Sequence, residues 1–188
     1  MANATQASAD TPLAYFAEGD ARRQRILDAA FECFVKSGYS KVAINHIALE
    51  AGLARPLIYL KFKSKEDIFL NLFEGIFDSQ LERVEALVDQ DVPARDKLLE
   101  IFNIMILELW PKLSGSPQGN DLLDATYQIF PKVNKRYRAR LATIMSNILG
   151  DTTECAEVLI LAVKGLYFDR PPVALLRHRI ALLVDRFV

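Results

Sequence analysis

Apolar residues recur at intervals of three and four along most of this chain, and glycine and proline fall between those stretches rather than within them. This spacing is that of an α-helix, and both residue types commonly end helices. The sequence therefore predicts an all-α protein. The predicted helices cover, in order, residues 20–37, 44–51, 56–62, 64–88, 94–109, 121–130, 132–149, 153–168 and 173–187, which makes about nine.

Basic residues are concentrated near the N-terminus, although the whole chain is close to neutral. Residues 20–65 contain nine Lys and Arg against four Asp and Glu, whereas residues 66–188 contain fourteen against eighteen. The N-terminal part therefore carries the positive charge that a nucleic-acid partner attracts.

The two cysteines, Cys33 and Cys155, lie far apart and have no Cys or His at metal-ligand spacing, so we expect neither a disulfide nor a metal site. Residues 1–11 lack the basic and apolar regions of a signal peptide, and no stretch reaches about 18 uncharged apolar residues. These features predict a cytoplasmic protein without a membrane partner.

The segment 43–62 has the features of a helix-turn-helix. Ala48 is small enough for two helices to cross closely, and Gly52 can adopt the left-handed backbone that the turn requires. Pro56 suits the first turn of the second helix, where its missing N–H is not needed. The apolar wedge between the two helices would consist of Ile47, Leu53 and Ile58.

This pattern alone also fits a helical hairpin with no role in DNA binding. Its surroundings favour DNA, because cations and an aromatic side chain cluster on the second helix and just after it. Such a helix fits a major groove of about 12 Å while the cations meet phosphates. The predicted DNA-binding residues are Lys41, Asn45, Arg55, Pro56, Leu57, Tyr59, Lys61, Lys63 and Lys65.

These residues together resemble the TetR family of transcriptional regulators. The resemblance runs without gaps over about residues 21–75, through the segments 25–30, 34–39, 47–53 and 58–66. It implies that segment 43–62 reads DNA and that Tyr59 and Lys65 contact phosphates. It also implies a homodimer that responds to a small molecule, with repression as the usual outcome.

Three positions depart from the family pattern. Val42, Ala43 and Leu57 stand where the family often has Thr or Ser, so hydroxyl contacts to DNA are missing. Leu57 could instead pack on a thymine methyl group, and Asn45 or Lys41 could take over the phosphate contact. We therefore expect the operator to be read mainly through charged and aromatic side chains.

The chain divides into three predicted parts. Residues 1–19 form a mobile N-terminal tail, residues 20–65 a three-helix helix-turn-helix domain, and residues 66–188 a helical ligand-binding and dimerisation domain. Ser64 and Asp67 form a variant of the capping box at the start of the long helix that follows the DNA-binding part.

The two C-terminal helices, 153–168 and 173–187, are apolar on nearly all sides and must therefore be buried on all sides. The core of a monomer would explain this as well as a subunit interface would. The resemblance favours an interface, and a dimer would place two reading heads on the half-sites of a palindromic operator. The predicted interface residues are Leu159, Ala162, Val163, Leu166, Leu176, Ile180, Leu183 and Val184.

Aromatic residues with a few polar neighbours between the two ends of the chain suggest a ligand pocket. The same residues are also typical of a closed core, which is the favoured interpretation for any single aromatic residue because large apolar side chains are mostly buried. We expect a small apolar or aromatic effector. The predicted lining is Phe69, Phe73, Phe77, Phe102, Met105, Trp110, Tyr127 and Phe130, with Asn103, Glu108 and Gln128 as polar groups.

Two other classes of function fit the sequence less well. No glycine-rich nucleotide loop, zinc-protease motif or nucleophile elbow occurs, so we expect neither an enzyme nor a cofactor. An all-helical adaptor could use the basic front against a protein or a membrane surface. The cations cluster around the helix-turn-helix and not along one long helix face, which favours double-stranded DNA as the partner.

Overall fold

The structure is a computed structural model that describes residues 21–116 and 118–188, so the predicted tail at 1–19 lies outside the described residues. The prediction of an all-α fold is confirmed, since these residues form helices and no strand. The elements are α1 (Ala21–Ser37), α2 (Ile44–Glu50), α3 (Arg55–Tyr59), α4 (Lys65–Val88), α5 (Ala94–Phe102), the π-helical segment η1 (Asn103–Leu107), α6 (Trp110–Ser114), α7 (Gly119–Ile129), α8 (Pro131–Leu149), α9 (Thr153–Leu166) and α10 (Val173–Val184).

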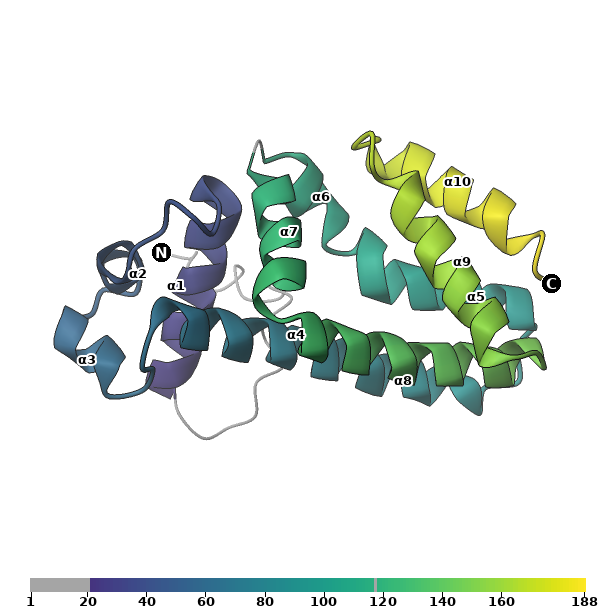
Figure 1. Cartoon of the computed structure of the whole chain (residues 1–188), viewed down its shortest axis with the longest axis horizontal. Helices are drawn as coiled ribbons and strands as arrows, with labels where there is room; N and C mark the ends of the chain where they lie inside the picture. Colours follow the sequence, from purple (N-terminus) through teal and green to yellow (C-terminus); the bar gives the residue numbers. More distant parts are fainter. Residues whose placement is uncertain (1–20, 117) are drawn as a thin grey trace, which may run out of the picture.

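The helices build two hydrophobic cores that share α4 (Figure 1). The first core joins α1, α2 and α3 to the first half of α4, where Phe69 and Leu72 are fully buried. The second core joins α5, η1, α8, α9 and α10 to the second half, where Leu81 and Val84 are fully buried. One continuous helix therefore connects the N-terminal module to the larger helical domain.

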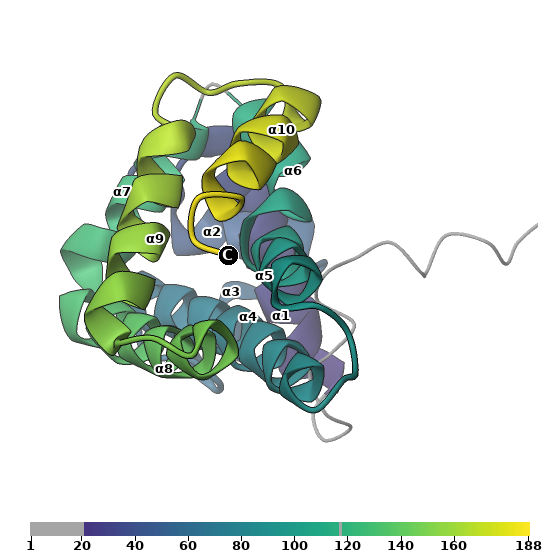
Figure 2. The ribbon, with the colours of Figure 1, turned by 90° about the vertical axis from the view of Figure 1, so that its right-hand side faces the viewer.

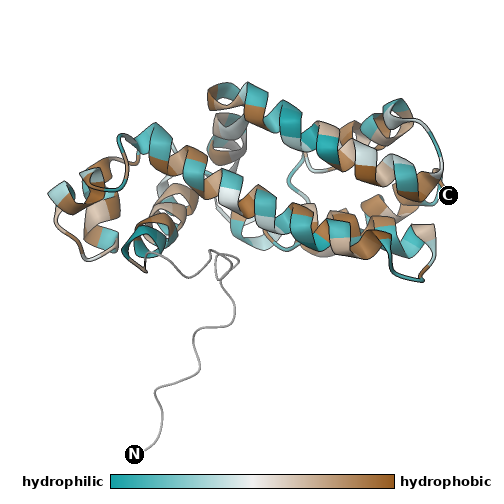
Figure 3. Cartoon of the chain, turned by 90° about the horizontal axis from the view of Figure 1, so that it is seen from below, coloured by the Kyte–Doolittle hydropathy of each residue, from teal (hydrophilic) through white to brown (hydrophobic). Residues whose placement is uncertain are grey.

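The long helices α4 and α8 lie side by side along the molecule, and α9 and α10 pack on the far part of the second core (Figures 1 and 2). Hydrophilic and hydrophobic residues alternate along the exposed side of α4 and α8 (Figure 3). This alternation is typical of helices that bury one stripe and expose the other to solvent.

The start of α4 is capped nearly as the sequence predicts. The Ser64 hydroxyl accepts a hydrogen bond from the Asp67 backbone N–H at 3.1 Å. The Asp67 carboxylate accepts in turn from the backbone N–H of Lys63 at 2.8 Å, one residue before the expected donor. The side chains of the N-cap residue Ser64 and of Asp67 thus fix the first turn of α4.

The predicted helix 94–109 is interrupted in the structure. It consists of α5 followed by the π-helical segment η1, and α6 then begins at Trp110. Pro111 occupies the first turn of α6, where proline is tolerated because no intrahelical partner is needed. Sequence periodicity treated this proline as a helix breaker and therefore did not predict α6.

An aromatic cluster fixes α1 on α4. The ring of Phe69 lies 5.3 Å from that of Phe34 and 4.6 Å from that of Tyr39, measured between ring centroids, with both pairs edge to face. The Tyr39 hydroxyl donates to the Glu66 carboxylate at 3.2 Å. The N-terminal module is therefore attached to α4 by packing and by a polar contact.

Gly52 has a backbone φ of +60°, which supports the predicted role of this glycine in the turn between α2 and α3. We expect Gly52→Ala to lower the free energy of unfolding by about 1–2 kcal/mol, because an L-residue in this conformation is strained. Space is not the obstacle, since an added Cβ would meet only the Arg25 guanidinium at 3.4 Å.

Urea denaturation of both Gly52→Ala and Gly52→Asn tests this expectation. Asparagine tolerates the left-handed region better than alanine, so Gly52→Asn should lose less stability despite its larger side chain. Equal losses would mean that the backbone conformation is not the cause.

Candidate functional site

The crossing of α2 and α3 has the geometry of a helix-turn-helix. Ala48 is buried where the two helices meet, and Ile47 and Ile58 are fully buried between them. The backbone N–H of Leu53 donates to the carbonyl oxygen of Ala48 at 2.9 Å, which closes the turn. The small residue, the turn glycine and the apolar wedge therefore act together as the sequence predicted.

Arg25 on α1 holds this turn from behind. Its Nε donates to the carbonyl oxygen of Ala51 at 2.8 Å, and its Nη2 donates to that of Gly52 at 3.1 Å. The guanidinium thus satisfies two carbonyl groups at the end of α2. Sequence analysis missed this role, because a contact between positions 26 residues apart leaves no local periodic signal.

The predicted DNA-binding residues gather on one end of the molecule, on α2 and α3 and on the segments that flank them (Figure 1). Leu57 and Lys65 are half-buried. The side chains that the structure leaves exposed are Lys41, Asn45, Arg55, Pro56, Tyr59, Lys61 and Lys63.

Arg55 and Tyr59 form a pair on the exposed face of α3. The Arg55 guanidinium donates to the Tyr59 hydroxyl at 3.0 Å and lies 5.4 Å from the centre of its ring. The residues are one helical turn apart, so each restricts the rotamers of the other. Leu60 beside them is 70% exposed, and sequence analysis did not propose it as part of this surface.

Lys65 differs from the other basic residues of this region. Its Nζ donates to the carbonyl oxygen of Tyr39 at 3.0 Å and lies 4.2 Å from the centre of the Tyr39 ring. Its ammonium group therefore stabilises the turn between α1 and α2. The turn includes exposed Lys41, so Lys65 helps to position a cation that is itself free to face an anion.

A cavity of about 160 Å³ lies between the halves of the larger domain. Its walls come from α4, α5, η1, α6, α7, α8 and α9. Six of the eight residues predicted as its lining contribute to it, namely Phe73, Phe77, Phe102, Met105, Trp110 and Tyr127.

Phe69 and Phe130 do not line the cavity. Phe69 is fully buried in the first core, and the Phe130 ring stacks on it with 5.9 Å between ring centroids. Phe69 lies on α4 one turn before Phe73, so the boundary of the cavity falls between them, although the first core continues along α4 to Ile76. Helical periodicity places both on the same apolar stripe and cannot locate that boundary.

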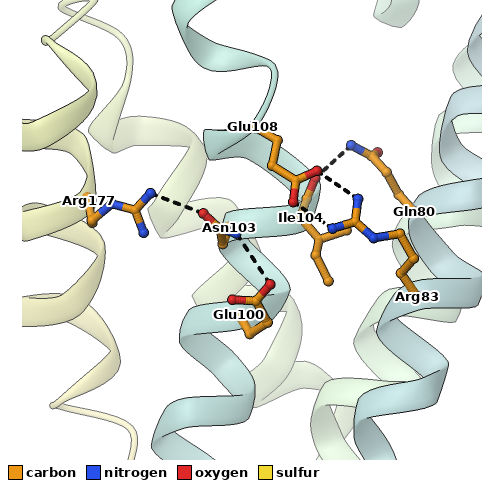
Figure 4. Close-up of polar contacts among 7 residues, drawn as sticks. All are labelled: Gln80, Arg83, Glu100, Asn103, Ile104, Glu108 and Arg177. Carbon is orange, nitrogen blue, oxygen red and sulfur yellow. Dashed lines mark hydrogen bonds and ion pairs between the residues drawn. The ribbon is translucent and has the colours of Figure 1, made fainter. Parts of the chain in front are cut away.

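The polar groups proposed from sequence are used elsewhere (Figure 4). Glu108 forms an ion pair with Arg83 at 2.6 Å, and the Asn103 side chain accepts a hydrogen bond from Arg177 at 3.1 Å. Gln128 is exposed. The cavity instead takes its polar side chains from Gln80, Thr126, Tyr127, Asn134, Tyr137, Arg138, Lys164 and Tyr167.

Gln80 connects α4 to the π-helical segment. Its amide Nε2 donates to the carbonyl oxygen of Ile104 at 2.8 Å, although the residue is only 5% exposed (Figure 4). The wider turn of η1 holds Met105 and Ile106 in the cavity wall. π-helical turns are frequent at functional sites, and this one shapes the cavity.

The helices α6 and α7 connect the cavity to the N-terminal module. Lys112 of α6 forms an ion pair with Glu32 of α1 at 3.3 Å, and the Ser116 hydroxyl, just after α6, donates to the carbonyl oxygen of Val35 at 2.6 Å. The backbone N–H and the hydroxyl of Ser40 both donate to the Asp121 carboxylate at 3.1 Å. Because Trp110 of α6 and Tyr127 of α7 line the cavity, its walls reach the helix-turn-helix module directly.

The C-terminal helices expose a different face from the one that sequence periodicity selected. Five of the predicted interface residues pack inside the protomer at no more than 1% exposure: Leu159, Val163, Leu176, Ile180 and Val184. The other three, Ala162, Leu166 and Leu183, are half-buried. The apolar side chains open to a partner are Val158, Leu161, Leu175 and Leu182, together with Phe168 after α9.

Residues 21–116 and 118–188 offer neither a metal site nor a membrane-spanning helix. These residues contain no group of three or more His, Cys, Asp or Glu side chains placed to hold a metal ion. Over the same residues, every helix is too short or too polar to cross a membrane.

A basic helix-turn-helix mounted on a helical domain with an apolar cavity defines a DNA-binding regulator. In agreement, residues 26–72 match the family described as bacterial regulatory proteins, tetR family. The chain is 39% identical over 139 residues to the fatty acid metabolism regulator protein of Bacillus subtilis strain 168, an alignment covering 71% of this chain and 69% of that one. The chain belongs to the TetR family of transcriptional regulators.

Solved structures share the fold over nearly the whole chain. A transcriptional regulator from Rhodococcus sp. Rha1 superposes with a TM-score of 0.71 at 18% identity, covering 88% of this chain and 95% of that one. A TetR-like regulator from Rhodococcus sp. RHA1 gives 0.65 at 20% identity, covering 91% and 97%. At such identities these structures establish the architecture alone.

Tyr137 in the cavity wall makes the stability of the protein sensitive to alkaline pH. Burial, followed by the hydrogen bond that its hydroxyl donates to Asp78 at 2.5 Å, raises the pKa of Tyr137 from 10.0 to about 12. The unfolded chain therefore loses this proton first as pH rises. The contribution of Tyr137 to stability should be complete below pH 10 and should disappear as pH approaches 12.

Urea denaturation of the parent protein and of Tyr137→Phe measures this contribution. At neutral pH the variant should be less stable by about 1–2 kcal/mol, because the hydrogen bond to a carboxylate is lost. The difference should shrink steadily between pH 10 and pH 12. A difference that stays constant over this range would contradict the assignment.

Proposed function

We propose that this protein is a homodimeric, ligand-responsive repressor that acts in the cytoplasm. It binds a palindromic operator through its two helix-turn-helix motifs and leaves the operator when a small apolar or aromatic molecule enters the cavity. The observation that carries this proposal is that α4, α6 and α7 each contribute both to the cavity wall and to contacts with the N-terminal module, α6 through the ion pair between Lys112 and Glu32.

In the proposed complex, α3 lies in the major groove. Arg55 and Leu57 face base edges, Arg55 through hydrogen bonds and Leu57 through a thymine methyl group. Tyr59 contacts a phosphate from the same helix. The phosphate contacts on either side come from Lys41, Asn45, Lys61 and Lys63, while Lys65 supports Lys41 through its bond to Tyr39.

Phosphate contacts and base contacts have different signatures. Lys63→Ala should weaken binding to all DNA sequences to a similar extent. It should also reduce the slope of log Kd against log salt concentration by about one. Arg55→Ala should weaken specific binding by about 1–3 kcal/mol and relax the preference at one operator position. Binding selection from random DNA, followed by Kd measurements at several salt concentrations, tests both.

Arg140→Ala is the matched control, since Arg140 lies on α8 away from the helix-turn-helix and pairs with Glu85 at 2.6 Å. It removes one positive charge without removing a DNA contact, so operator affinity should be unchanged. If Lys63→Ala and Arg55→Ala both behaved like this control, α3 and its flanks would not be the DNA-binding surface.

The proposed dimer forms through the outer faces of α9 and α10 (Figure 2). Val158 and Leu161 lie one turn apart on α9, and Leu175 and Leu182 lie two turns apart on α10, so each pair shares a face. Their exposure ranges from 41% to 57%, which is unusual for large apolar side chains at neighbouring positions. A second copy of the chain would bury this surface.

Leu161→Glu should disrupt the dimer, because a carboxylate would be buried without a partner at the interface. We expect the dissociation constant of the dimer to rise at least about tenfold and the affinity for a palindromic operator to fall with it. Light scattering after gel filtration measures the first effect. Val92→Glu, at a position 43% exposed between α4 and α5, is the matched control and should remain dimeric.

The effector would act by changing the distance or angle between the two helix-turn-helix motifs of the dimer. A molecule that moves Phe73 or Phe77 would tilt α4, and one that moves α7 would act on the turn at Ser40 through Asp121. Effector and operator would then oppose each other with a single coupling free energy, typically about 1–3 kcal/mol.

The apolar walls of the cavity fit such an effector. The relative from Bacillus subtilis is named as a regulator of fatty acid metabolism. A role in controlling genes for the metabolism of apolar acids is therefore in keeping with both the cavity and the relationship.

A further inference from the structure

Two cations line the cavity and no acidic residue does. Arg138 reaches it from α8 and Lys164 from α9, whereas its lining contains neither Asp nor Glu. Most of the remaining wall is apolar. A cation beside such a wall favours an anion in the cavity, because the low polarity of the surroundings strengthens their attraction.

Arg138 has a hydrogen-bond donor that is not used by the described part of the chain. Its Nε is buried and has no hydrogen-bond partner there. Arg138 forms an ion pair with Glu157, whose Oε1 lies 3.9 Å from Nε, beyond hydrogen-bonding distance, and Glu157 does not line the cavity. Buried guanidinium donors are normally paired, which makes this Nε suited to a ligand oxygen.

Lys164 supplies the second charge. Its Nζ lies 4.5 Å from the centre of the Tyr127 ring, and it makes no ion pair within residues 21–116 and 118–188. The ring stabilises the ammonium group without neutralising its charge. Arg138 and Lys164 therefore place two cationic side chains on one cavity, and Lys164 is the one of the two without an ion-pair partner among the described residues.

The volume and the walls limit the rest of the ligand. An apolar cavity of about 150 Å³ accommodates benzene, so the cavity of about 160 Å³ fits a body the size of one aromatic ring or a short acyl chain. Aromatic side chains form much of the wall and offer edges and faces to such a body. They are Phe73, Phe77, Phe102, Trp110, Tyr127, Tyr137 and Tyr167.

We propose that the effector is a small carboxylate, with a compact apolar body among the aromatic side chains and its anionic group at Arg138 and Lys164. This inference rests on the proposed function in taking the cavity as the effector site. It adds that the ligand is an anion and that Arg138 and Lys164 select for its charge.

Trp110 offers a direct readout of binding, because it is the only tryptophan of the chain and lines the cavity. Its fluorescence can be titrated with phenylacetate, neutral phenylacetamide and cationic phenethylamine, and with octanoate and octanamide. The carboxylates should bind at least about tenfold more tightly than their amides, as expected for hydrogen bonds to a charged group. Comparing phenylacetate with octanoate distinguishes an aryl body from an acyl body.

Variants of the two cations test their assignment. Arg138→Gln and Lys164→Gln should each lower carboxylate affinity about tenfold and leave amide affinity unchanged, whereas Arg138→Lys should retain most of the preference. Arg140→Gln, one charge removed from the same helix outside the cavity, should have no effect. Thermal unfolding checks that each variant is folded. If a Gln variant misfolds, the test rests on Arg138→Lys and the parent protein, each titrated with the carboxylate and amide probes.

The results separate this inference from the proposed function. It is overturned if amides or the amine bind as tightly as the carboxylates, if the Gln variants weaken both probe types equally, or if no carboxylate binds. Carboxylate binding that leaves operator affinity unchanged would support the ligand class and contradict the regulatory function. Release from the operator by the amides alone would support the regulatory function and contradict the proposed ligand class.

Discussion

The burial of α4 in two separate cores is the constraint on which the rest of the structure depends. Its first half is held by Phe34 and Tyr39 through Phe69, and its second half by the helices around Leu81 and Val84. A helix of 24 residues spans about 36 Å, so α4 extends without interruption from the first core into the second. The cavity lies along this helix, where the two cores separate.

A second connection runs beside the first. The Asp121 carboxylate holds the turn at Ser40 while Tyr127, on the same helix, faces the cavity. Two elements that enter the N-terminal module at different points restrict its position more than one would. Packing and hydrogen bonding thus connect the helix-turn-helix module, the helices around the cavity and the helices α9 and α10.

Sequence reasoning succeeded where the determining interactions are local. Ala48, Gly52 and Pro56 lie within nine positions of one another, and each sets a backbone or packing requirement that its neighbours share. It failed where apolar stripes on different helices had to be assigned to partners. Leu159 and Leu161 are equally apolar, yet one is fully buried within the protomer and the other is 49% exposed.

The sequence by itself determined the all-α class, the helix-turn-helix and the basic character of its exposed helix, because helical spacing, turn conformation and charge are properties of short segments. Only the tertiary structure decided which aromatic residues enclose the cavity and that Arg138 and Lys164 both line it. It also decided that Arg25 supports the turn between α2 and α3. Those residues come from helices far apart in the chain, and their proximity depends on how the helices pack.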